Sequence, residues 1–291
     1  MAITGKPVFL GSGKVRLKFT YSGLYTMRED GVVELRSSGI FIPEGSMKVD
    51  IFGVGGGGKG AAPRNSYENR GYGGGGGGYT KTVKGVDLIA GVEYPVTIGA
   101  GSNEYTKDGN ATSFGSVLTA AGGKTASSSD ANVGTTGANG GSGGGGGTAI
   151  RQMSGMVGAK GGSNGGNGNS NTIPSGKNGY TGPGGSGQGT TTREFGDVTG
   201  RLYAGGGGGG MCAVDYATAT ASEGGDGGGG TGALISSTST TNVTLISTAS
   251  TAGTKNTGGG GGGGAIAGDN VVMPSGDGGS GIVCIRLHKA T

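Results

Sequence analysis

The chain has 291 residues, of which 79 are glycine and only 7 are proline, and it contains no tryptophan. Glycine adds no side chain to a core, so a large hydrophobic core is excluded, and the lack of a sustained Gly-X-Y period excludes collagen. The formal net charge is +4 with 14% charged residues and no basic block, so nucleic-acid binding is not indicated.

Residues 1–42 differ from the remaining chain in their modest glycine content, and they are predicted to form an N-terminal β docking segment. Residues 14–19 and 32–36 alternate polar and apolar side chains, as strands with one buried face do. Asp30-Gly31, between them, is a hairpin signal. Periodicity leaves two roles open: docking to another protein, or completing the sheets of the remaining chain.

Residues 43–291 are predicted to form one glycine-rich β/polyglycine-II domain. Strand-like segments occur at residues 48–54, 79–84 and 92–98. Residues 282–288 form the last such segment, and we expect it to close a sheet that residues 48–54 open. No stretch shows helical periodicity with a cap. The predicted fold class is therefore all-β, a small β-sandwich with glycine-rich insertions and almost no α-helix.

Uninterrupted glycine runs separate these segments, at residues 55–58, 73–78, 143–147, 205–210, 227–230 and 258–264. Such a composition is typical of low-complexity disorder, but flexible linkers need no such regular punctuation by strands. We therefore predict an ordered bundle of polyglycine-II helices, which have three residues per turn and peptide groups free to bond to neighbouring rods. Positions predicted to lie inside rods are Gly55, Gly75, Gly145, Gly207, Gly228 and Gly261.

Connectors between rods would be displayed at the rod ends, where no lattice contact restricts their side chains. Tyrosine and arginine there favour recognition, because they offer a large contact area with a polar group. The candidate receptor contacts are Arg64, Tyr67, Arg70, Tyr105, Tyr180, Met211, Asp215 and Tyr216. Alternatively, each tyrosine covers an end of the lattice. Residues 232–236 and 243–247 are apolar clusters around a Ser/Thr-rich turn, which predicts an extended hairpin.

The sequence indicates no catalytic, metal or cofactor site, so we expect a protein that is not an enzyme. His288 is the only histidine, which leaves no second imidazole for a multi-histidine site. Cys212 and Cys284 lie far apart without Cys-x-x-Cys spacing, so we expect free thiols. There is no signal-peptide core and no 18-residue apolar run, from which we expect synthesis in the cytoplasm and no membrane insertion.

A set of blocks recurs in a characteristic order along the chain, at residues 38–45, 49–58, 73–80, 94–101, 111–115, 203–210 and 278–283. In this order they resemble the glycine-rich domains of bacteriophage tail fibres and receptor-binding tip proteins, including the polyglycine-II adhesins of T-even phages. The resemblance implies a virion protein that contacts other tail or fibre proteins and attaches to a host surface polysaccharide or outer-surface protein. It favours a homotrimer, with a monomeric cap on another fibre as the alternative. The alternatives are a purely structural head, collar or neck fibre and a non-viral extracellular glycine-rich protein.

Overall fold

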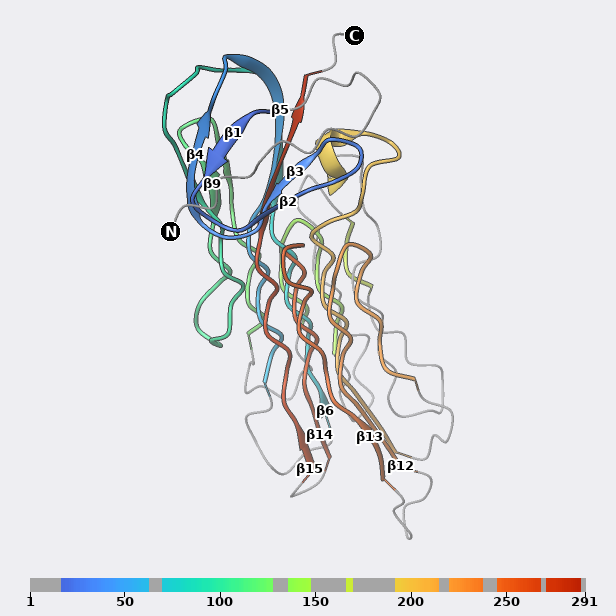
Figure 1. Ribbon diagram of the computed structural model, residues 1–291. Coiled ribbons are helices and arrows are strands. Elements are labelled where there is room, and N and C mark those ends of the chain that lie inside the picture. The colour runs from blue at the N-terminus through green and yellow to red at the C-terminus, as the bar shows by residue number, and fades with distance from the viewer. Residues whose placement is uncertain are drawn as a thin grey trace.

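The computed structural model describes residues 17–62, 70–127, 136–147, 166–169, 192–214, 220–237, 245–267 and 271–288. Along its long axis the molecule has a β-sandwich at one end, a bundle of extended glycine segments in the middle and two small sheets at the other end (Figure 1). The described residues contain no α-helix, in agreement with the all-β prediction. None of their helical turns is long and apolar enough to cross a membrane.

Two five-stranded antiparallel sheets form the sandwich. The first has the order β1 (Phe19–Tyr21), β4 (Gly39–Pro43), β8 (Tyr94–Thr97), β9 (Thr112–Phe114) and β10 (Leu118–Ala120). The second has the order β2 (Tyr25–Met27), β3 (Val33–Leu35), β16 (Ile282–Leu287), β5 (Met47–Val54) and β7 (Thr80–Leu88). The main hydrophobic core lies between them and includes Phe41, Ile51 and Phe114, all with no exposed surface.

The expected strand pairing of the glycine-rich part is confirmed. β16 runs antiparallel to β5, from Ile282 opposite Val54 to Leu287 opposite Val49. Because these strands come from residues far apart in sequence, their pairing ties the two ends of the glycine-rich region together.

The N-terminal segment supplies strands to both sheets. Arg28 N–H donates to the Val32 carbonyl at 2.9 Å, which closes the hairpin predicted at Asp30-Gly31. The expected first strand was wrong, because so tight a turn pairs β3 with the residues directly before it, β2, rather than with residues 14–19. β1 and β4 pair in the other sheet. The described part of the segment thus completes the sandwich, while a docking role stays a prediction.

Backbone hydrogen bonds join the glycine segments of the bundle, and they recur at every third residue. Residues 55–61 donate from every third N–H to residues 73–79, at N···O distances of 3.0, 2.8 and 2.9 Å. The N–H groups between them donate to other segments, as Gly56 does to Asn110. A repeat of three residues is what the polyglycine-II helix requires, and that conformation stays a prediction.

Side-chain exposure follows the same period on the outside of the bundle. In one outer segment the exposed residues are Ala121, Lys124 and Ser127, each three positions from the next. The inner segments are glycine because a neighbour lies on every side, whereas outer segments can carry a side chain on the one free side.

Five of the six glycines placed inside rods, namely Gly55, Gly75, Gly145, Gly207 and Gly261, are buried. Gly228 is only half-buried and has φ +98°, next to Gly227 at φ +90°. This run therefore begins with a turn in the left-handed region, which glycine adopts without strain.

Candidate functional site

Two three-stranded sheets close the bundle at the end opposite the sandwich (Figure 1), which we call the distal end. One has the order β15 (Val271–Met273), β14 (Ala265–Ala267) and β6 (Arg70–Gly71). The other has the order β11 (Met211–Val214), β12 (Leu234–Ser237) and β13 (Leu245–Thr248). β12 and β13 are antiparallel, so the hairpin expected around residues 232–247 is confirmed.

A small apolar core holds the two distal sheets together. Cys212, Ile235 and Ala265 are each at most 2% exposed and belong to one cluster that also includes Val271 and Met273. On the outside of the sheets Ile246 and Val272 are 47% and 51% exposed. The distal end is thus a second packed unit with apolar side chains on its surface.

The structure places three of the eight candidate receptor contacts. Arg70 is half-buried in β6, Met211 is 4% exposed in β11, and Tyr105 is 43% exposed beside the glycine segments rather than at the distal end. Burial of Met211 leaves little of its side chain for a partner. The other five, Arg64, Tyr67, Tyr180, Asp215 and Tyr216, lie outside the described residues.

Residues 59–72 and 265–277 lie between uninterrupted glycine runs and so were expected to be connectors, but some of them belong to the bundle. Lys59 N–H donates to Thr125 Oγ1 at 3.0 Å. Tyr72 N–H donates to the Gly264 carbonyl and is 3% exposed. The carbonyl of Asp277 accepts from Gly253 N–H at 2.8 Å. The connectors are therefore shorter than the spacing of the uninterrupted glycine runs suggested, because non-glycine residues fit wherever a segment has a free side.

The sandwich end carries a buried group of charges that the sequence did not predict. Residues 192–204, which we call the clip segment, lie on the outer face of the β2-β3-β16-β5-β7 sheet and include the short 3-10 turn η2 (Glu194–Gly196). Phe195 and Tyr203 of this segment pack on Phe52, with ring centroids 6.1 and 5.3 Å away. The apolar contacts press the polar side chains of the segment against those of the sheet.

Arg28 and Glu194 form the central ion pair between sheet and clip segment. The guanidinium donates to both carboxylate oxygens, at 2.7 and 2.8 Å, and a further bond at 3.1 Å reaches Asp30. The Arg28 side chain is 12% exposed and that of Glu194 is 5% exposed. Paired, charge-assisted bonds of this kind are both strong and geometrically specific.

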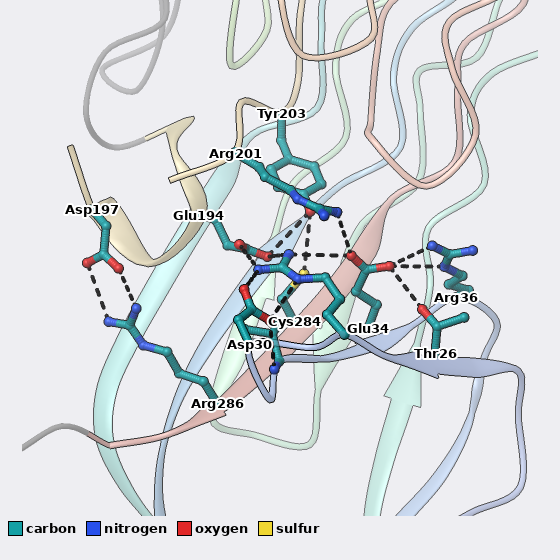
Figure 2. A network of polar contacts seen from close by, with 12 residues as sticks. Thr26, Asp30, Glu34, Arg36, Glu194, Asp197, Arg201, Tyr203, Cys284 and Arg286 are labelled. Carbon is teal, nitrogen blue, oxygen red and sulfur yellow. Dashed lines mark hydrogen bonds and ion pairs between the residues drawn. The ribbon is translucent and has the colours of Figure 1, made fainter. Parts of the chain in front are cut away.

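Glu34 of β3 is the second buried carboxylate, and it lies beside Glu194 beneath the Tyr203 ring in Figure 2. Arg36 donates to it at 2.6 Å and Arg201 of the clip segment at 3.1 Å. Its side chain is 3% exposed. Arg28 also donates to Glu34, at 3.4 Å, so one guanidinium joins both buried carboxylates.

Asp50 and Arg286 form the third set of contacts. Asp50 accepts from Arg286 Nε at 3.0 Å and lies 2.6 Å from His288 Nδ1. Arg286 also pairs with Asp197 of the clip segment, and its guanidinium carbon lies 4.2 Å from the centroid of the Phe195 ring. We call the whole set the ion cluster, and its members are Arg28, Asp30, Glu34, Arg36, Asp50, Glu194, Asp197, Arg201, Arg286 and His288.

The environment lowers the pKa values of Glu34 and Asp50, two buried carboxyls of the cluster. Burial alone would raise the pKa of Glu34, but hydrogen bonds from Arg36 and Thr26 outweigh it, so the pKa is lowered. Burial would also raise the pKa of Asp50. The hydrogen bonds to His288, the Gly85 N–H and Arg286 outweigh this effect, so the pKa of Asp50 is lowered. These carboxylates are therefore charged at neutral pH and attract the arginines at full strength.

A cleft of about 490 Å³ opens beside the cluster and is lined by Arg28, Asp30, Glu194, Asp197, Arg201 and His288 among others. The charges that line the cleft neutralise one another.

The nearby Cys284 thiol has no exposed surface. Its burial, and to a smaller extent the charge of Glu194, raise the pKa of this thiol, which makes it a poor nucleophile. Among the described residues no group of three or more His, Cys, Asp or Glu side chains could hold a metal ion. The ion pairs fasten the clip segment to the sheet.

One half of the ion cluster has a sequence signal. Glu34 and Asp50 interrupt apolar strands, and a charge within a buried strand requires a partner. The clip segment has no corresponding signal, since a three-residue turn after a long glycine-rich stretch has no periodicity.

Comparison with protein families shows which family the chain belongs to. Residues 36–288 match the family model described as a glycine-rich domain. The chain therefore belongs to the glycine-rich domain family. A search of curated proteins found no match.

Proposed function

We propose that the chain is a virion fibre or tail-tip protein that attaches to the host cell surface through connectors at the distal end. The observation that carries the proposal is the separation of the two ends by a bundle bonded through its backbone. Such a bundle is stiff and does not depend on connector side chains, so the connectors can vary with the receptor while the fold persists.

Chain connectivity supports the assignment of contacts to the distal end. The segments 63–69, 215–219, 238–244 and 268–270 each begin and end at or beside the distal strands. They contain Arg64, Tyr67, Asp215 and Tyr216, half of the candidate receptor contacts. The opposite end, with its sandwich and ion cluster, would join the chain to other virion proteins.

Adsorption of virions tests the proposal. A triple variant, Tyr67→Ala, Asp215→Ala and Tyr216→Ala, is expected to reduce adsorption by about tenfold or more, because tyrosines are frequent energetic centres of interfaces, while particles assemble in normal number. The matched control changes two exposed apolar residues of the sandwich end, Ile89→Ala and Val198→Ala, which are 59% and 77% exposed. Unchanged adsorption of the triple variant would contradict the proposal and favour a purely structural head, collar or neck fibre.

A further inference from the structure

The flank of the glycine bundle carries an aromatic side chain that is both exposed and held in place. Tyr105 is 43% exposed. Every other tyrosine or phenylalanine in the described parts of the chain is buried or half-buried. An exposed aromatic ring offers a flat apolar surface to a ligand.

A buried lysine supports the ring from below. Lys59 lies within the glycine bundle, its side chain is 8% exposed, and its ammonium lies 4.8 Å from the centroid of the Tyr105 ring. The same ammonium pairs with Asp277. A cation attracts the face of an aromatic ring. One face of the Tyr105 ring therefore lies against Lys59, and the remaining part of the ring provides the exposed surface.

The loop that carries Tyr105 is anchored on both sides. Ser102 Oγ lies 2.8 Å from the Glu104 carbonyl oxygen and 2.6 Å from that of Lys107, and Ser102 N–H donates to Gly57 of the bundle at 2.9 Å. The Thr125 hydroxyl also donates to the Lys107 carbonyl, at 2.5 Å. A ligand would therefore meet a preorganised ring and lose little affinity to the ordering of a loop.

The charges on the loop that carries Tyr105 and on the segments beside it cancel in pairs, which narrows the chemistry of the ligand. The pairs are Lys59 with Asp277, Lys107 with Glu104, and Lys124 with Asp108. All three carboxylates and two of the three ammonium groups are at least 42% exposed. A balanced surface of this kind gives no net attraction to an anionic polymer or to a cation, but it offers many donors and acceptors around a flat apolar ring.

We propose that Tyr105 and the ion pairs around it form a binding site for a neutral saccharide. The apolar C–H face of a pyranose ring stacks on the open face of Tyr105, and its hydroxyl groups exchange hydrogen bonds with the neighbouring carboxylates and ammonium groups. The inference names the chemistry of one contact within the proposed function and rests on it. It places that contact on the flank of the bundle, so that a surface polysaccharide can lie along the fibre while the connectors at its end bind elsewhere.

Binding of the purified full chain to an array of defined neutral and acidic glycans tests the site. We expect at least one neutral glycan to bind, Tyr105→Ala to weaken that binding by about tenfold or more, and Tyr105→Phe, which keeps the ring, to retain it. Ile89→Ala, a 59% exposed position at the sandwich end, is the matched control and should bind as the unaltered chain does. An unchanged unfolding midpoint of Tyr105→Ala confirms that the variant is folded.

The proposal is overturned if no neutral glycan binds, if only acidic glycans bind, or if Tyr105→Ala binds the same glycans as strongly. Adsorption of virions separates this outcome from failure of the proposed function. Glycan binding lost in Tyr105→Ala with adsorption unaffected by both this variant and the distal triple variant would leave the saccharide site standing and remove the adhesin role. Adsorption that depends on the distal connectors, without any glycan binding, would support the adhesin role and remove the saccharide site.

Discussion

Gly207 is the position where one added methyl group tests the glycine bundle most directly. Its N–H donates to the Gly75 carbonyl at 2.8 Å, and its carbonyl accepts from the Gly145 N–H at 2.9 Å. A Cβ atom built on Gly207 would lie 2.0 Å from the carbonyl oxygen of Gly261. That oxygen belongs to the backbone of another segment, so Gly207→Ala forces the segments apart.

The cost follows from the bonds that must lengthen. Leaving one buried donor or acceptor without a partner costs about 1–3 kcal/mol, and the two bonds of Gly207 then give about 2–6 kcal/mol. A total unfolding free energy of about 5–15 kcal/mol is typical, so Gly207→Ala is expected to remove a large part of the stability. The free energy of unfolding in urea, followed by circular dichroism, measures the loss.

Gly45→Ala is the matched control. A Cβ atom at Gly45 has no neighbour within 4 Å, and its φ lies outside the left-handed region. The same replacement there should change stability by less than about 1 kcal/mol, and in the stabilising direction, because alanine restricts the unfolded chain. Equal midpoints for Gly207→Ala and Gly45→Ala would refute the view that the segments pack backbone to backbone.

Three further predictions concern the sandwich end. Gly31→Ala should cost about 1 kcal/mol in urea unfolding, because φ at Gly31 is +84° although no atom obstructs a Cβ; a change near zero would contradict the turn. Glu194→Gln should weaken the attachment of the clip segment to the sheet by about 2 kcal/mol. In a variant that lacks the other cysteine, Cys284 should then react about thirtyfold faster with a thiol reagent. Asp87→Asn breaks an exposed ion pair and should leave the rate of this reaction unchanged. Lowering the pH should destabilise the chain, because folding lowers the pKa values of three cluster carboxyls. Their contribution to stability is complete above the ordinary carboxyl pKa values and is lost as the pH falls through the lowered pKa values. An unfolding midpoint that does not change between neutral pH and about pH 3 would refute this prediction.

Two strands of the sandwich, β5 and β16, were predictable from their apolar residues. Both strands are mostly apolar and adjoin glycine, and both are buried on two faces, one in the main core and one under the clip segment. Their pairing follows because the chain must return from the bundle to the sheet that it left. The hairpin of β2 and β3 was identified by its Asp-Gly turn, but its first strand was misplaced because residues 14–19 alternate more clearly than β2 does.

The clip segment and the distal core could not be predicted, because their contacts join short segments with no period of their own. Phe195 has φ +56°, a conformation that no local signal favours for phenylalanine. In this conformation its ring packs on Phe52 and Arg286. Met211 follows a glycine run directly and so resembled an exposed connector. It is buried because β12 runs beside it, with Leu234 as its partner.

The bundle restricts where this chain can carry function. An inner glycine cannot take a side chain without displacing a neighbour, so side chains are confined to the two ends and to the free sides of the outer segments. Lys59 illustrates the rule, since its side chain leaves the bundle on a free side and is at once used by Asp277 and Tyr105. Substitutions within the bundle should therefore change stability, and substitutions at the distal end or on the flank should change binding, with little overlap between the two sets. That separation lets the surface of the protein change with its ligand while the backbone lattice stays the same.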